Sequence, residues 1–222
     1  MKLHSLGISS KGNCHILTDS SGSSLILDCG IDYKVLLRNI EDWNNVACVL
    51  YTHSHRDHIR CLPELAKAGM RLYGYDNMKT GHAYKISPTW KIMAIPMIHN
   101  VDCIGFIIYN TVDDKYIVYA TDTQMLPKIH AREYDLLLVE CNWTERLVQD
   151  NAEHSVFSDS NYGEHLSTEV LSSWLEHMDK VHDTIILTHM SPNNIDYLYT
   201  AELVKPYCTH FMFAEKGKVI CF

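Results

Sequence analysis

The segment "LYTHSHRDH", residues 50–58, places three histidines and one aspartate within six positions, directly after an apolar run. Side chains at i and i+2 of a strand share a face, so His53 and His55 are expected to point the same way. Asp57 and His58 are adjacent and must diverge, so in a turn they can serve a second point. Two metal ions about 3.5–4 Å apart fit that geometry. A single tetrahedral ion would use only some of the four side chains.

Other apolar, strand-like runs also end in a side chain that can bind a metal. Asp28 ends such a run in "SLILDCG", His99 in "IMAIPMIH", Asp122 in "YIVYATD" and His189 in "TIILTH". Taken singly, each of these residues could simply cap a turn. Because the pattern recurs after several strands, it favours one shared site. The ligand types exclude a structural zinc site of the Cys₄ or Cys₂His₂ kind.

These motifs resemble those of the metallo-β-lactamase superfamily. "HSHRDH" matches its HxHxDH signature, and "LILDCG", the lone His99, "TDT" and "LTHMS" match its other motifs in the same order. The resemblance extends over essentially the whole chain. It implies an α/β fold, an αββα sandwich of two mixed β-sheets flanked by helices, and hydrolysis at a dinuclear metal centre.

The resemblance also implies how seven ligands are divided between two divalent ions. The first ion is bound by three histidines: His53, His55 and His99. The second ion is bound by Asp57, His58 and His189. Asp122 bridges both ions. All donors are nitrogen or oxygen, which favours zinc and is also compatible with manganese or iron. The antibiotic-hydrolysing branch uses a cysteine ligand that this chain lacks, which argues against β-lactamase activity.

Residues next to the predicted ligands are candidates for orienting the imidazole rings. We favour that role for Asp28, because a carboxylate at the end of a buried strand would otherwise be unpaired. Thr52 and Thr188 are explained at least as well as β-branched strand residues.

Three further stretches resemble a small bacterial and phage branch of phosphodiesterases related to ribonuclease Z: "SSKGNCHIL", "GEHLST" and "LTHMSPNN". Such phosphodiesterases carry an extra histidine just before a helix, which here is His165. It would stabilise charge on a phosphate oxygen or protonate the leaving oxygen while a metal-bridging hydroxide attacks. The alternative is a histidine that only caps the helix. Asp57 and His165 are the predicted catalytic residues, and Glu140 either orients a histidine or forms a surface salt bridge.

The chain departs from ribonuclease Z where that family selects tRNA. It has no glycine-rich basic arm, and the segment between Asp122 and His189 is too short for a large cap domain. Asn100 replaces a frequent aspartate, and Lys11 replaces a small residue. These differences argue against tRNA processing and leave the phosphodiester class.

The composition predicts a single domain over residues 1–222, because a chain of this length with 46% hydrophobic residues can bury a full core. The first residues lack the apolar core of a signal peptide, and no window approaches the roughly 18 apolar residues of a membrane span. We therefore predict a soluble, cytoplasmic protein without a membrane partner. The eight cysteines form no CxxC pair, so we expect buried free thiols.

Strand-like runs dominate the first half, and strands alternate with helices later, which favours a two-sheet sandwich. Helical spacing in "HLSTEVLSSWLEHM" predicts a helix with a hydroxyl N-cap at Ser167 or Thr168. The segment "THFMFAEKGKVICF" is predicted to form a closing hairpin that turns at Lys216 and Gly217. The polar segment 150–164 is interpreted as a lid or a mobile loop.

The predicted function is a dinuclear-metal phosphodiesterase or nuclease whose partner and substrate is small or single-stranded nucleic acid. The alternative is a carboxylic ester, thioester or lactone hydrolase. The net charge of −8 and the absence of a Lys/Arg-rich run favour this alternative, whereas His165 disfavours it. A non-enzymatic binding module would require eroded ligands, and all seven are present.

Overall fold

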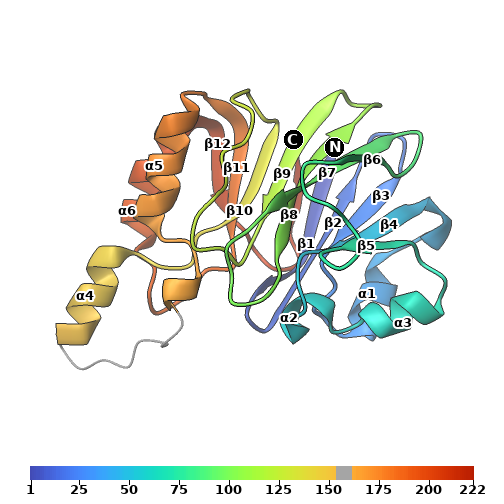
Figure 1. Ribbon diagram of the computed structural model, residues 1–222, viewed down its shortest axis with the longest axis horizontal. Coiled ribbons are helices and arrows are strands. Elements are labelled where there is room, and N and C mark those ends of the chain that lie inside the picture. The colour runs from blue at the N-terminus through green and yellow to red at the C-terminus, as the bar shows by residue number, and fades with distance from the viewer. Residues whose placement is uncertain (154–161) are drawn as a thin grey trace.

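The computed structural model describes residues 1–153 and 162–222, whose strands form two facing sheets (Figure 1). The first sheet has the order β13-β1-β2-β3-β4-β5 and contains β1 (Lys2–Ser9), β2 (Gly12–Thr18), β3 (Ser24–Leu27), β4 (Val46–Tyr51), β5 (Leu72–Gly74) and β13 (Val219–Cys221). The second has the order β12-β11-β10-β9-β8-β7-β6 and contains β6 (Ala83–Lys85), β7 (Trp90–Pro96), β8 (Ile104–Asn110), β9 (Lys115–Ala120), β10 (Leu136–Glu140), β11 (His182–Thr188) and β12 (Cys208–Phe213).

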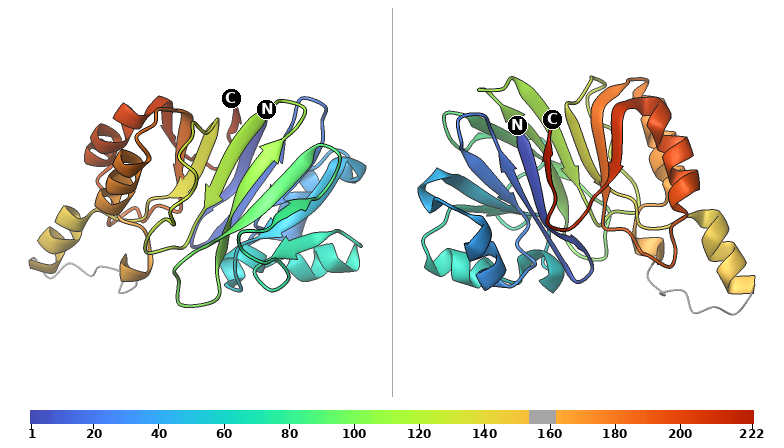
Figure 2. Two further views of the ribbon diagram at one scale, coloured as in Figure 1. Left: turned by 45° about the horizontal axis from the view of Figure 1, so that its top comes forward. Right: turned by 180° about the vertical axis from the view of Figure 1, so that it is seen from behind.

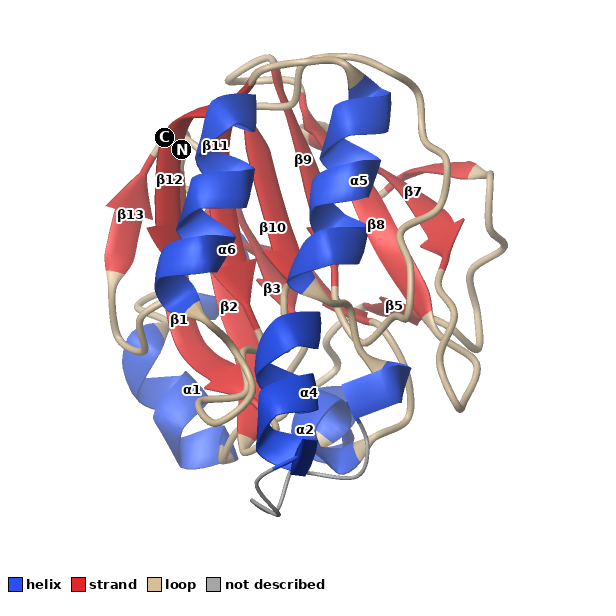
Figure 3. Cartoon of the chain, turned by 90° about the vertical axis from the view of Figure 1, so that its left-hand side faces the viewer, coloured by secondary structure: helices blue, strands red, loops and turns tan. Residues whose placement is uncertain are grey.

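Helices cover the outer faces of both sheets (Figures 2 and 3). Those against the first sheet are α1 (Tyr33–Asn39) and α3 (Leu62–Lys67), and those against the second are α5 (Thr168–Met178) and α6 (Tyr197–Val204). The remaining elements are α2 (Arg56–Ile59), α4 (Glu145–Glu153) and the 3₁₀ turns η1 (Trp43–Asn45), η2 (Tyr162–Glu164) and η3 (Lys205–Tyr207). The predicted αββα sandwich is confirmed.

The central strands are apolar on both faces because both faces are covered. In β10, Leu136 and Leu138 pack into the core between the sheets, whereas Leu137 and Val139 pack under α5 and α6. Alternate residues of a strand point to opposite faces, so each face of β10 contributes to a different core. This double burial explains the unbroken apolar run "LLLV" and makes β10 an internal strand.

Parallel pairing brings the carboxyl ends of several strands to one end of the sandwich. In the first sheet β3 and β4 are parallel, and in the second β9, β10, β11 and β12 are parallel. The side chains that follow these strands therefore meet at the same end. The short helix α2, which carries Asp57 and His58, lies at this end, away from the chain termini (Figure 1).

Three residues at these strand ends have a left-handed backbone conformation. The φ angles are 55° at Asp28, 50° at Asp122 and 55° at His189. For a residue other than glycine this conformation costs on the order of 1–3 kcal/mol, and it persists only where the surrounding structure holds it. The strain is therefore concentrated where the strands deliver polar side chains.

The closing segment is not the hairpin predicted from the sequence. β12 pairs in parallel with β11 of the second sheet, whereas β13 pairs antiparallel with β1 of the first sheet. The turn at Gly217 exists, with φ of 82°, but it carries the chain from one sheet to the other. Gly217 N donates to Ser5 O at 2.6 Å, so the first sheet captures the last strand.

Several local predictions can also be compared with the structure. Ser167 is the N-cap of α5, as predicted, because its side chain accepts a hydrogen bond from Val170 N. All eight cysteines are free, as predicted, and six of them are buried, whereas Cys208 is half-buried and Cys221 is exposed. The segment 150–164 begins in α4 and ends in η2, while its middle part, including the lid prediction, lies outside the described residues. No helix in residues 1–153 and 162–222 is long and apolar enough to cross a membrane.

Candidate metal centre

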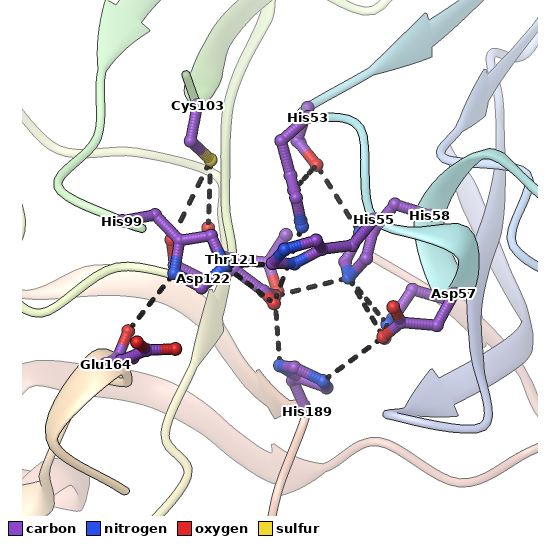
Figure 4. Close-up of polar contacts among 12 residues, drawn as sticks. His53, His55, Asp57, His58, His99, Cys103, Thr121, Asp122, Glu164 and His189 are labelled. Atoms are coloured by element: carbon purple, nitrogen blue, oxygen red, sulfur yellow. Dashed lines mark hydrogen bonds and ion pairs between the residues drawn. The ribbon is translucent and has the colours of Figure 1, made fainter. Parts of the chain in front are cut away.

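The residues predicted as ligands of the first ion lie together with Asp122 (Figure 4). His55 Nδ1 is 3.2 Å from His99 Nε2. Asp122 Oδ2 is 3.8 Å from His53 Nε2 and 3.8 Å from His99 Nε2. One donor atom of each of these four residues lies within 4.8 Å of every other. We call the three histidines the first ligand group.

The second ligand group consists of Asp57, His58 and His189, whose donor atoms also lie within 4.8 Å of one another. Asp57 Oδ2 is 3.4 Å from His58 Nε2 and 3.9 Å from His189 Nε2. Asp122 Oδ1 is 3.3 Å from His58 Nε2, so the two oxygens of Asp122 face different groups. This placement suits the bridging role predicted for Asp122.

Two buried nitrogen atoms show how well the site fits a metal. His53 Nε2 and His189 Nε2 are buried and have no hydrogen-bond partner among the described residues. A buried polar atom without a partner costs about 1–3 kcal/mol, and a metal ion in each ligand group would give each of these two nitrogens a partner. The donor set of imidazole nitrogens and carboxylate oxygens suits zinc and related divalent ions. The residues present therefore fit a metal site.

The charges around the two groups differ. Burial lowers the pKa of His53 to about 2 and also lowers the pKa of His99, so these imidazoles are neutral. Burial also lowers the pKa of His58 and of His189, but nearby carboxylates, Asp122 first, outweigh it. The pKa of His58 is raised well above its usual value, and that of His189 to about 10. The second ligand group therefore attracts positive charge.

Asp28 fixes the orientation of His58, as favoured from the sequence. Its Oδ2 atom accepts a hydrogen bond from His58 Nδ1 at 2.8 Å, which leaves His58 Nε2 facing the site. Thr52 N donates to Asp28 Oδ1 at 2.8 Å, and Tyr119 Oη donates to Asp28 Oδ2 at 2.6 Å. The Tyr119 hydroxyl thus reaches from the second sheet to a carboxylate that follows a strand of the first.

The two threonines have different environments. Thr52 Oγ1 lies 2.9 Å from His53 Nδ1 and also contacts Asp28, so it supports both ligand groups. Thr188 Oγ1 is buried without a hydrogen-bond partner among the described residues. The interpretation as a β-branched strand residue therefore suits Thr188 but not Thr52.

The opening motif supplies a residue to which the sequence assigned no role. Asn13 Nδ2 lies 3.3 Å from Asp57 Oδ2 and 2.9 Å from His58 Nε2. Asn13 stands in "SSKGNCHIL", so the motif was the signal that could have identified it. The same region requires a glycine, because a Cβ atom at Gly30 would lie 1.5 Å from the carbonyl oxygen of Asp57. This close approach sets the position of α2.

Glu140 is fully buried, so the alternative of a surface salt bridge is wrong. Its Oε1 atom is 2.5 Å from His165 Nδ1 and 3.0 Å from His189 Nδ1, and its Oε2 accepts from Thr123 N at 3.0 Å. One carboxylate thus holds a predicted ligand and the predicted catalytic histidine in fixed orientations.

His165 lies beside both ligand groups. Its ring centroid is 5.0 Å from that of His189 and 5.8 Å from that of His99, and 16% of its side chain is exposed. Ser167 caps α5, so His165 is not the side chain that does so. Burial lowers the pKa of His165, but the Glu140 carboxylate raises it by more, so the net shift is upward.

Comparison with known proteins identifies a family model and several similar folds. Residues 10–70 match the model of the metallo-beta-lactamase superfamily. The metallo-beta-lactamase fold protein YhfI from Bacillus subtilis superimposes with a TM-score of 0.73 at 18% identity, covering 99% of this chain and 98% of that one. Zn²⁺-bound PqqB from Methylobacterium extorquens also gives 0.73, at 12% identity and full coverage of both chains.

Human tRNase Z, short form, gives a TM-score of 0.64 at 14% identity, covering 100% of this chain and 99% of that one. At such identities the likeness shows the fold alone. No curated protein matches the chain by sequence.

Proposed function

We propose that this protein is a metal-dependent hydrolase of the metallo-β-lactamase superfamily that cleaves phosphodiesters in small or single-stranded nucleic acid. The match of residues 10–70 to the superfamily model and the shared fold support this proposal. The observation that carries the proposal is the placement of His165. Its imidazole is held by the buried Glu140 carboxylate and lies next to both ligand groups.

We infer that the two ligand groups hold two divalent ions, with zinc favoured by the donor atoms. The first group is His53, His55 and His99, the second is Asp57, His58 and His189, and Asp122 is shared. Such ions supply Lewis acidity and generate a nucleophile from water at neutral pH. Asp28 and Glu140 orient His58 and His189, so each imidazole presents a defined nitrogen to the centre.

His165 acts in this proposal as the acid or charge stabiliser. The upward shift of its pKa, caused by the Glu140 carboxylate against the effect of burial, favours the imidazolium form. Nδ1 is bonded to Glu140, so Nε2 is the atom that would donate to a phosphate oxygen or the leaving oxygen. Asp57 has a side chain that is 23% exposed, and its carboxylate would accept the proton of the attacking water.

Human tRNase Z, whose name describes a nuclease, shares the fold over the whole chain, which supports nucleic acid as the substrate class. An ester, thioester or lactone hydrolase is the second candidate. The net charge of −8 favours it, because a strongly acidic protein repels polyanions away from its metal site. Small or single-stranded substrates carry fewer phosphates than duplex nucleic acid. A net charge of −8 therefore repels them less and is compatible with phosphodiesterase activity.

The test combines elemental analysis with a comparison of substrates. We expect about two equivalents of a divalent metal in the purified protein. We also expect turnover of bis(p-nitrophenyl) phosphate to exceed that of a lactone and of a thioester, followed by cleavage of labelled single-stranded DNA or RNA. Efficient hydrolysis of the lactone or the thioester without phosphodiester turnover would establish the second candidate instead.

A further inference from the structure

A cleft of about 870 Å³ opens beside the first ligand group and takes no part in the chemistry proposed above. It lies between the segments 75–82 and 97–104, and His99 is one of its lining residues. Sites that bind a drug-sized ligand have volumes of roughly 300–1,000 Å³, so this cleft is large enough for one. A ligand that entered it would extend directly from the metal centre.

The wall formed by the segment 75–82 is held by contacts at both of its ends. Near its start, Tyr51 Oη donates a hydrogen bond to Asp76 Oδ1. Near its end, Gly81 N donates to Ala94 O at 2.9 Å. These bonds tie the segment to β4 of the first sheet and β7 of the second. This side of the cleft is therefore preformed.

The opposite wall is anchored in the same way. Ile98 N donates to Thr123 Oγ1 at 3.0 Å, and Ile104 N donates to Thr52 O at 3.1 Å. Both acceptors belong to segments that deliver predicted ligands. A ligand held against this wall would thus be placed at a fixed distance from the metal centre.

The lining combines an apolar floor with a rim of both charges. The apolar part is formed by Tyr75, Met78 and Met97, together with Ile98, whose side chain is exposed. Lys79, His82 and Asp102 lie at the rim and are exposed. Within the described part of the chain, neither Lys79 nor Asp102 forms an ion pair. The Asp102 carboxylate repels a row of phosphates, so the rim suits a neutral group with hydroxyl and N–H donors.

We propose that this cleft binds the nucleoside on one side of the scissile phosphodiester, an inference that rests on the proposed phosphodiesterase function. The base would contact the apolar floor. The Asp102 carboxylate would accept hydrogen bonds from sugar hydroxyls or base N–H groups, and Lys79 would face the adjoining phosphate. One preformed nucleoside site and a single lysine suit a short substrate of a protein with a net charge of −8.

The kinetic test uses two substrates that differ in the nucleoside. Thr80 lines the cleft and is exposed, so Thr80→Trp would fill the cleft with little effect on folding. We expect kcat/KM for the p-nitrophenyl ester of thymidine 5′-monophosphate to fall roughly 10-fold, because the variant loses substrate binding. Turnover of bis(p-nitrophenyl) phosphate should stay within about twofold. The matched control is Thr209→Trp on β12, another exposed threonine, which should change neither rate.

A binding measurement separates this proposal from the proposed function. Calorimetric titration of the metal-loaded protein with thymidine 5′-monophosphate should show binding that Thr80→Trp weakens about 10-fold and Thr209→Trp does not change. If no phosphodiester is hydrolysed, the proposed function fails, and this titration alone decides the role of the cleft. Equal affinities of all three proteins, or no binding at millimolar nucleotide, would overturn the nucleoside site. An equal fall in both kinetic assays would do the same.

Discussion

The two ligand groups share Asp122 but differ in what lies behind their imidazole rings. In the first group, His53 is backed by the Thr52 hydroxyl, and His99 Nδ1 lies 3.4 Å from the carbonyl oxygen of Glu164. In the second, His58 is backed by Asp28, and His189 by Glu140; both carboxylates are fully buried.

A carboxylate behind an imidazole increases the basicity of the ring and fixes its orientation. Neutral partners fix the orientation without adding negative charge. The second ion is therefore expected to depend on residues that do not contact it, whereas the first depends mainly on its own ligands. Substitutions should separate these two dependencies.

The largest effect is expected from Asp122→Ala, because Asp122 is the member that the two groups share. Its Oδ2 and Oδ1 atoms face different groups, so both ions should be lost. Turnover should fall by at least about 10³-fold. Elemental analysis of the purified variant should show well below one equivalent of metal. Retention of one full equivalent would show that Asp122 serves a single ion.

The next largest effect is expected from His165→Ala, which lies beside both groups but belongs to neither in the proposal. Both metals should be retained, while turnover of phosphodiesters falls about 10²-fold through loss of an acid or charge stabiliser. Steady-state kinetics and metal content, measured on the same preparation, test this. A parallel loss of metal and activity would make His165 a ligand rather than a catalytic residue.

Asp28→Asn should weaken the second ion far more than the first, because Asp28 contacts His58 directly but reaches His53 only through Thr52. The variant removes the charge behind His58 but keeps the shape of the side chain, so affinity for the second ion should fall about 10- to 100-fold. A two-site titration of the metal-free protein with zinc resolves the two binding steps. If both steps weaken equally, the asymmetry between the groups is wrong.

The smallest effect is expected from Tyr119→Phe, which removes one donor from the Asp28 carboxylate. We expect the second binding step to change only a few-fold, since the altered group is separated from the ion by Asp28 and His58. Tyr134→Phe is the matched control, because Tyr134 is equally buried and donates to His130 O at 3.1 Å, outside the site. Thermal unfolding of each metal-free variant shows whether a change in metal binding is due to a general loss of folding stability.

The positions of the predicted ligands follow from sequence because strand ends can be recognised locally. An apolar run of β-type residues ends at a polar side chain, as at His53, Asp122 and His189, and parallel strands end on the same side of a sheet. The ligand chemistry and the strand pattern therefore predict one site. Two-residue periodicity gives the face of each residue, and in β10 alternate residues do pack into different cores.

What lies across the sandwich cannot be predicted in this way. Periodicity places Tyr119 on an inner face, but only the packing of the two sheets decides that its hydroxyl meets Asp28. Likewise, the residues that flank Glu140 in the sequence do not determine whether its carboxylate faces solvent or a histidine. The closing segment is predicted to be a hairpin because its sequence contains the residues typical of a hairpin turn. The partner of its last strand is instead determined by the free edge of β1.

The left-handed backbone at Asp28, Asp122 and His189 has a consequence for engineering. Glycine would relieve the conformational energy at each position, but it would also remove a side chain of the site. Selection for heat resistance alone should therefore favour glycine at these three positions. Such substitutions would raise the melting temperature but remove residues of the site. Asp179, which ends α5 with φ of 48°, has the same backbone without the chemistry. Asp179→Gly is thus a route to a more heat-resistant protein that leaves the site intact.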